Sequence, residues 1–214
     1  MVEYKREVWG GLPGIAADVI SAGGCAMVDV LNDLCREGTY VAVYGNSETP
    51  SKFMFGRILC VGDTRFAMLL ISPNGEYDGI VVDDLEDIIR VAAHGKYHEK
   101  MMKLICPNEV NLQLPDIDES HIDRSVLIYA KETNRLVSIE LEESGAVDVC
   151  GFVEEVSEAT CKILEVDEYG FQDGDSVLDL RSISQISMDS ADENRVMKLY
   201  RANYKAASLF DHKA

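Results

Sequence analysis

Residues 56–88 read GRILCVGDTRFAMLLISPNGEYDGIVVDDLEDI, and a similar stretch follows 95 positions later. There residues 151–183 read GFVEEVSEATCKILEVDEYGFQDGDSVLDLRSI. The register continues without a gap, and 13 of the 51 positions from Phe55 to Ile105 are identical to their counterparts. The identities are mostly glycines, aliphatic residues and an Asp-Gly pair: Gly56 and Gly151, Leu69 and Leu164, Gly75 and Gly170, Asp78-Gly79 and Asp173-Gly174, Val82 and Val177. A match of this length in one register indicates an internal duplication.

Each copy shows the same order of expected elements: a helix, five short strands and a closing helix. Apolar runs bounded by turn residues predict the strands, and a 3.6-residue apolar period predicts the helices. In the first copy these are a helix at 28–36, strands at 40–44, 52–61, 65–72, 79–83 and 88–92, and a helix at 96–105. In the second copy they are a helix at 119–131 with Asp116 and Asp118 as N-cap candidates, strands at 136–141, 147–156, 160–166, 175–178 and 183–188, and a helix at 192–205.

The segments outside the repeats predict the domain organisation. Residues 106–118 hold two prolines and three acidic residues, which predicts a linker between separately folding halves at 27–105 and 119–214. Residues 1–26 have two interpretations. They are either an N-terminal arm with a strand at 4–9, or an extension ahead of a native start at Met27, where codons for Gly23-Gly24 could supply a ribosome-binding purine run.

The composition excludes several classes of protein. The hydrophobic fraction is 47%, and no apolar run reaches the length of a membrane span, so we expect a globular protein without a membrane segment. The net charge is −18, with 10 basic and 15 acidic residues in 1–105 and 10 and 23 in 106–214, which argues against a surface for duplex nucleic acid. Six cysteines with no C-x-x-C pair and no zinc spacing favour a reducing, cytoplasmic location.

A helix followed by five short strands, with Gly56 or Gly151 inside a long second strand, resembles the Sm-like barrels and the wider SH3-like barrels. The resemblance implies a mainly β fold with flanking helices, built as two small five-stranded barrels. Members of the Sm family that bind RNA carry an Asn after the second strand and an Arg-Gly pair near the fifth. Ala67-Met68 and Ile89-Arg90-Val91 stand there in the first copy, and Lys162-Ile163 and Ser184-Gln185-Ile186 in the second. The resemblance therefore extends to the fold and not to the RNA pocket.

We interpret the repeated residues as structural first. The aliphatic sets Val82, Leu85, Ile88 and Val177, Leu180, Ile183 are expected to face the core of each barrel. Asp78 and Asp173 precede glycine, so we expect them to accept hydrogen bonds within turns.

Motifs for catalysis or cofactor binding are missing from the sequence: there is no Gly-x-Ser-x-Gly, P-loop or dinucleotide fingerprint. His94 and His98 are spaced as metal ligands on a helix could be, but Gly95 lies between them and no third ligand is evident, so we expect no enzyme, no cofactor and no metal site.

Two function hypotheses follow. The first is a non-catalytic adaptor whose tandem barrels bind a protein partner or a second copy. The second is an RNA-binding Sm-like protein, which would use a stripe on the last helix: Arg195, Lys198, Tyr200, Arg201 and Lys205.

Overall fold

The computed structural model describes residues 25–45, 52–105, 112–142 and 144–211. Its helices are α1 (Cys25–Glu37), α2 (Lys96–Leu104), α3 (Ile122–Thr133) and α4 (Ala191–Asp211), with a 3-10 turn η3 (Leu180–Ser182). Its strands are β1 (Tyr40–Gly45), β2 (Met54–Val61), β3 (Arg65–Ile71), β4 (Tyr77–Asp84), β5 (Ile88–Ala92), β6 (Leu136–Leu141), β7 (Val149–Val156), β8 (Thr160–Val166), β9 (Gln172–Asp179) and β10 (Ile183–Met188).

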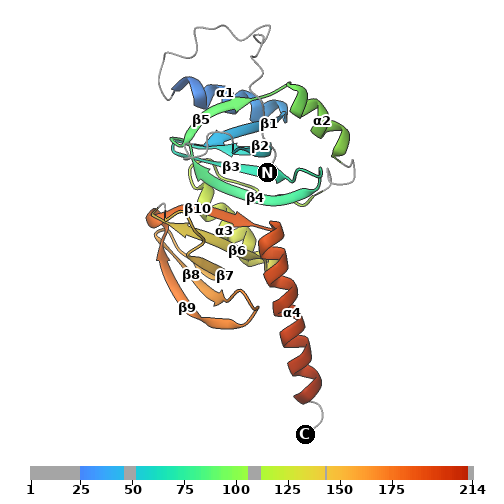
Figure 1. Ribbon diagram of the computed structural model, residues 1–214. Helices are drawn as coiled ribbons and strands as arrows, with labels where there is room; N and C mark the ends of the chain where they lie inside the picture. The colour runs from blue at the N-terminus through green and yellow to red at the C-terminus, as the bar shows by residue number, and fades with distance from the viewer. Residues whose placement is uncertain (1–24, 46–51, 106–111, 143, 212–214) are drawn as a thin grey trace.

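The ten strands form one antiparallel sheet in the order β5-β1-β2-β3-β4-β10-β6-β7-β8-β9. The expectation of a mainly β fold with flanking helices is confirmed. Within the sheet the five strands of each half follow the same order, and β4 of the first half pairs with β10 of the second. The paired residues are Val82 with Ile186, Val81 with Ser187 and Ile80 with Met188. Figure 1 shows the two halves one above the other, with β4 facing β10.

Repeated glycines occur where the backbone of another element comes close. A Cβ added to Gly56 or Gly151 would lie 1.8 or 2.2 Å from a carbonyl oxygen of the neighbouring strand, so no side chain fits at either position. Gly75 and Gly170 have φ of +87° and +81°, and each lies against the closing helix of its own half. These identities therefore have the structural role expected of them.

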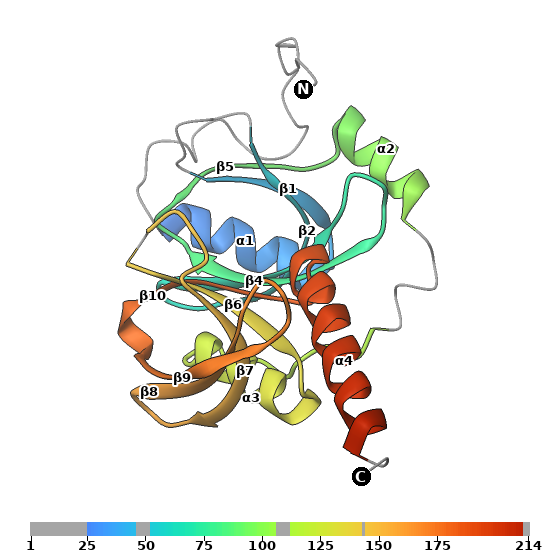
Figure 2. The same cartoon turned by 60° about the horizontal axis from the view of Figure 1, so that its bottom comes forward.

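The core of the protein crosses the boundary between the halves. Its largest cluster combines Ala67, Ile80 and Val82 of the first half with residues of α3 and the second half. Figure 2 shows α3 beside the second half and α1 over the first. Leu114, in the described part of the predicted linker, packs against two of the core clusters. The halves thus share buried surface, and their independence as domains remains a prediction.

Some expected boundaries shift in the structure. The strands expected at 79–83 and 175–178 extend to 77–84 and 172–179, so Asp78 and Asp173 lie inside strands and the turn assignment was wrong. The N-cap of α3 is His121; Asp118 instead accepts a hydrogen bond from the Ser120 N–H. Helix α1 begins at Cys25, ahead of the alternative start at Met27. The strand expected at 4–9 lies outside the described residues.

Candidate functional site

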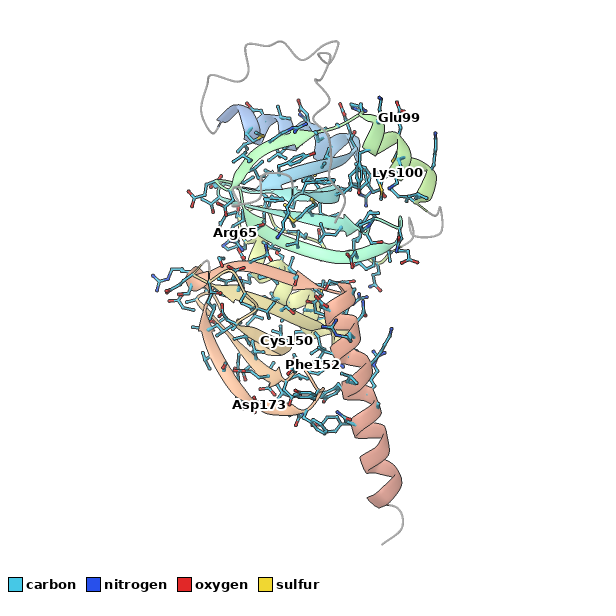
Figure 3. The ribbon with its side chains drawn as sticks, in the orientation of Figure 1. Arg65, Glu99, Lys100, Cys150, Phe152 and Asp173 are labelled. Carbon is cyan, nitrogen blue, oxygen red and sulfur yellow. The ribbon has the colours of Figure 1, made fainter. Side chains whose placement is uncertain are left out.

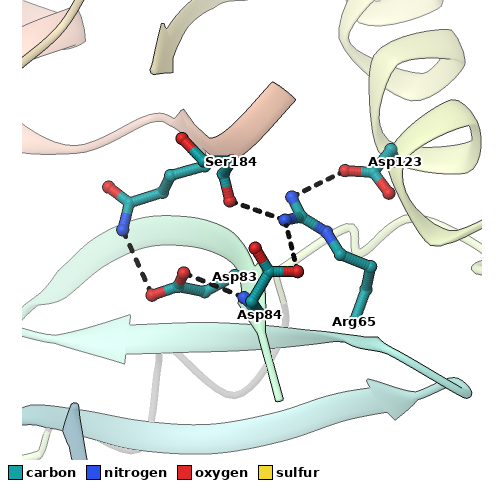
Figure 4. A network of polar contacts seen from close by, with 6 residues as sticks. Arg65, Asp83, Asp84, Asp123 and Ser184 are labelled. Carbon is teal, nitrogen blue, oxygen red and sulfur yellow. Dashed lines mark hydrogen bonds and ion pairs between the residues drawn. The ribbon is translucent and has the colours of Figure 1, made fainter. Parts of the chain in front are cut away.

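A partly buried polar network joins the halves beside the β4 to β10 pairing. Arg65 lies on β3, and its guanidinium donates to the Ser184 carbonyl at 2.6 Å and to Asp123 at 2.8 Å. The same guanidinium lies 3.0 Å from the carboxylate of Asp84 (Figure 4). One arginine from the first half therefore holds a strand and a helix of the second.

Asp83 is the second polar anchor of this junction. Its Oδ2 accepts a hydrogen bond from Gln185 Nε2 at 3.2 Å, and its Oδ1 accepts the Asp84 N–H at 2.9 Å. Burial raises the pKa of Asp83 to about 6, because desolvation outweighs these two hydrogen bonds and the nearby Arg65. Burial also raises the pKa of Asp123, with Arg65 opposing the shift. These carboxyl groups are tied to protein groups at the junction.

The chain bends between β10 and α4 at Met188, Asp189 and Ser190, and we call this bend the elbow. The elbow packs against β4 in the space left by the missing side chain of Gly79, which we call the bay. A Cβ at Gly79 would lie 2.3 Å from the Met188 carbonyl oxygen, so only glycine leaves room for this elbow. Asp189, at the bend, has φ of +64°. The neighbouring Asp78 accepts a hydrogen bond from the Ala191 N–H, the first residue of α4, at 3.1 Å. The Asp-Gly pair of the first half thus binds an elbow of the second half rather than making a turn.

The Asp-Gly pair of the second half has the same backbone shape and an empty bay. Gly174 has φ of +105°, and a Cβ there would meet no described atom within 4 Å. Asp173 is exposed, at the end of the second half away from the first (Figure 3). Val177 is 67% exposed, whereas its counterpart Val82 is fully buried, so the expectation that Val177 faces the core was wrong. The reason is that β9 ends the sheet, whereas β4 has β10 beside it.

Strand β5 ends the sheet on the other side. Among the described residues it pairs only with β1, and Ile89 on it is 51% exposed. His94, in the bend that follows β5, has φ of +59°, close to the +64° of Asp189 in the bend that follows β10. Neither free edge was predicted from the sequence. The sequence feature that could have indicated the β9 edge is the Asp173-Gly174 pair, which matches Asp78-Gly79 of the first half although it forms no turn.

Apolar side chains gather beside β9, at the hairpin that precedes it and on α4. The exposed members are Tyr169, Phe171, Leu199 and Tyr204. The hairpin is fixed to the helix, because Asn203 Nδ2 donates to the carbonyls of Tyr169 and Gly170 at 3.0 Å. This end of the molecule therefore presents a strand edge flanked by apolar surface.

The stripe expected on the last helix is only partly assembled. Arg195, Lys198 and Arg201 are exposed on α4, and Arg195 is ion-paired with Asp192 at 2.9 Å. Tyr200 lies elsewhere on the helix, half-buried against the ring of Phe152 at 4.9 Å.

The remaining member of the stripe, Lys205, has a side chain outside the described ones. The helix itself extends beyond the second half (Figure 1). The structure therefore brings the described cations together but leaves the tyrosine out of the group.

The first half has two further features, an open groove and a pair of neighbouring histidines. An open groove of about 640 Å³ is lined mainly by apolar and aromatic residues, among them Phe53, Phe55 and Tyr97. The ring centroids of His94 and His98 lie 5.5 Å apart. The pKa of His98 is lowered, mainly by burial and secondly by the neighbouring His94. In the part of the chain that the structure describes, no three His, Cys, Asp or Glu residues are grouped to hold a metal ion. Nor does any described helix have the length and apolar character to cross a membrane.

Comparison with known proteins adds little to this geometry. No family model and no curated protein matches the chain. The structure of YcgR in complex with c-di-GMP from Escherichia coli is 7% identical, covers 88% of this chain and 93% of that chain, and has a TM-score of 0.18. The apo structure of MrkH from K. pneumonia is 10% identical, covers 85% and 94%, and also has a TM-score of 0.18. At such TM-scores the likeness carries no argument about fold or function.

Proposed function

We propose that this chain is a non-catalytic binding protein of the cytoplasm, in which two tandem barrels of the Sm-like or SH3-like type offer a strand edge to a protein partner. One observation carries the proposal: β9 keeps the left-handed glycine by which β4 accommodates its neighbour β10, yet β9 pairs only with β8, and no described strand lies along its other edge. An extended protein segment added to such an edge gains main-chain hydrogen bonds, and flanking side chains give specificity.

The surroundings of β9 support an extended, non-acidic partner. Asp173, Asp175 and Asp179 all lie on this strand, in the half of the chain that holds 23 acidic and 10 basic residues. A segment rich in acidic residues would be repelled there. The exposed Phe171 and Val177 supply apolar contacts along the same edge.

The carboxyl chemistry supports a binding role rather than catalysis. Asp83 and Asp123 have raised pKa values, as general acids and bases often do. Both side chains are hydrogen-bonded within the junction between the halves, to Gln185 and Arg65 respectively. Their burial is explained by the contact that joins the two halves.

RNA binding is the second candidate, favoured by the exposed Arg195, Lys198 and Arg201 on α4. The acidic second half opposes it, because a polyanion meets long-range repulsion before it reaches these cations. We expect uridine-rich single-stranded RNA to bind no tighter than about micromolar at physiological salt, as in non-specific contact. Fluorescence titration measures this. Nanomolar affinity that is lost when the three cations become alanine would replace the protein-binding proposal.

Photo-cross-linking in cells tests the proposed function. A benzoylphenylalanine placed at Val177 on the β9 edge is expected to form adducts with protein. The same group at Val147, which is 61% exposed but outside β9, is the matched control and is expected to form far fewer. Adducts with RNA, or equal yields at the two positions, would contradict the proposal.

A further inference from the structure

The open groove of the first half has the size and lining of a small-molecule site. Its volume of about 640 Å³ lies within the usual range of ligand pockets, about 300–1,000 Å³. Its walls are mainly apolar, and three of the lining residues are aromatic: Phe53, Phe55 and Tyr97. We propose that this groove binds a small planar aromatic compound that carries an anionic group. This ligand is separate from the protein partner proposed for the β9 edge.

The strands that form the groove have no free edge. The lining residues come from β1, β2, β3 and β4, from the segments directly before β2 and after β3, and from α2. Each of these four strands lies between two others in the sheet. An extended protein segment would therefore find no main-chain groups to pair with here, in contrast to the β9 edge. The groove instead suits a ligand that is held by side chains.

Contacts among the aromatic side chains fix the walls of the groove. The ring of Tyr97 lies edge-on to the rings of Phe53 and Phe55, with centroids 5.0 and 5.3 Å away. Met101, one helical turn after Tyr97 on α2, is fully buried and anchors the helix. Phe53 and Tyr97 remain partly exposed. A flat ring packs well against such surfaces, edge-to-face or offset, so the walls favour a planar aromatic ligand.

The repeated fold does not require these aromatic residues. The equivalent positions of the second half, 95 residues later, hold no aromatic side chain: Asp148 replaces Phe53, Cys150 replaces Phe55 and Asp192 replaces Tyr97. The second half nevertheless has its five strands in the same order. The aromatic cluster is therefore a feature of the first half alone, as expected for a binding site added to a repeated scaffold.

The charges around the groove favour an anion. Lys52 is an exposed member of the lining, and the ammonium of Lys100 lies 5.6 Å from the centroid of the Tyr97 ring. Among the described lining residues the one acid is Asp78, which already accepts the N–H of Ala191. A cationic ligand would meet two ammonium groups, whereas an anionic group can pair with Lys52. Charge complementarity therefore selects an anionic group beside the ring.

Isothermal titration calorimetry on the full chain tests the proposal, with 2-naphthoate as the probe. We expect one site per chain, with a dissociation constant of tens to hundreds of micromolar. Two further probes separate the two parts of the ligand. Naphthalene-2-methanol keeps the rings without the charge, and octanoate keeps the carboxylate without the rings. Each is expected to bind about fivefold more weakly or worse.

Single substitutions locate the binding. Lys52→Gln removes a charge at an exposed position and is expected to weaken binding of 2-naphthoate by about fivefold, with naphthalene-2-methanol unaffected. Tyr97→Ala removes one wall and is expected to weaken both naphthalene probes by about tenfold. Lys198→Gln and Tyr204→Ala are the matched controls. Both residues are exposed on α4, outside the groove, so binding is expected to be unchanged.

Three results would overturn the inference: no binding of 2-naphthoate to the full chain, equal affinities for the three probes, or binding that Lys52→Gln and Tyr97→Ala both leave unchanged. The first result, combined with binding after deletion of residues 1–24, would show that a segment of the chain itself occupies the groove.

Discussion

Strands β4 and β9 are the same strand of the repeat in two environments. Both begin with an aromatic or polar residue and an Asp-Gly pair, both hold the glycine in a left-handed conformation, and both pair with the strand before them. Val82 is nevertheless fully buried and Val177 is 67% exposed. The difference teaches that two strands with the same backbone conformation at their Asp-Gly pairs bury different surfaces, because only one of them has a neighbour on its second edge.

Separating the two halves is expected to cause the largest loss of stability, because it removes β10 from beside β4. Fragments 27–108 and 116–214 are each expected to unfold cooperatively, because each keeps a helix, five strands and most of its own core. The first fragment exposes Ala67, Ile80 and Val82, so it should lose about 3 kcal/mol relative to its stability in the full chain. Thermal unfolding followed by circular dichroism measures this. If neither fragment unfolds cooperatively, the halves share one core and the boundary is misplaced.

Gly79→Ala and Gly174→Ala test at single positions how the neighbour of β4 and the open edge of β9 affect the free energy of unfolding. Both glycines have a positive φ, so both variants carry strain of about 1 kcal/mol. At Gly79 the added methyl group also meets the backbone of the β10 elbow at 2.3 Å, and we expect a further loss of about 2 kcal/mol or more. Urea unfolding at low protein concentration measures both losses. Equal losses would show that the elbow can move away freely.

Asp83→Asn tests what the junction adds, since the counterpart of Asp83 in the second half is Leu178. The pKa of Asp83 is raised from 3.8 to about 6, so its favourable contribution is full below about pH 4 and is lost as the pH rises through 6. The asparagine variant should therefore be more stable at pH 7, by about 2 kcal/mol, and less sensitive to pH between 4 and 6.

Asp179→Asn is the contrasting variant for the pH experiment. Hydrogen bonds from Arg181 lower the pKa of Asp179 to about 2. The contribution of this carboxylate is therefore present above about pH 4 and lost as the pH falls toward 2, the opposite direction from Asp83. Urea unfolding across pH measures both variants. A wild-type stability that rises between pH 4 and 6 by an amount that Asp83→Asn does not change would refute the assignment to Asp83.

The smallest effect is expected from deleting residues 1–24, ahead of α1. The core cluster of the first half takes its helical residues from Met27, Val28 and Leu31 onward, so the free energy of unfolding should stay within about 0.5 kcal/mol of the wild type. Differential scanning calorimetry suffices for the measurement. A loss of several kcal/mol would mean that the arm packs against the first half.

Much of the fold could be predicted, because glycines, turn residues and apolar periods act locally. Strands such as Ile88–Ala92 and Thr160–Val166 have the predicted bounds. The pairing of β4 with β10 could not be predicted, since backbone hydrogen bonds between strand edges leave no pattern in side chains. The exposure of β9 could partly be predicted from the sequence. Lys162 stands where the first half has Ala67, and Asp175 stands where it has Ile80, which indicates that this surface of the second half is not buried as the surface at β4 is.

The candidate site was harder to predict than the fold. Arg195 and Lys198 are exposed as a helical period predicts, but Tyr200 follows Val196 by one helical turn and shares its inward face. Spacing along the helix could have separated the two faces. The elbow bends at His94 and Asp189 have no common residue type, so only the backbone shows that they correspond.

The connection from Ile105 to His121 has a consequence for the abundance of the protein. It ties β10 to β4, and short tethers of this kind keep two binding edges at an effective concentration on the order of millimolar. A partner that docks on the β9 edge has no tether to this chain, so only the concentration of that partner brings the two together. If a partner binds β9 as proposed, the fraction of β9 edges that are covered depends on the abundance of both proteins, while the junction within each chain stays formed at any dilution.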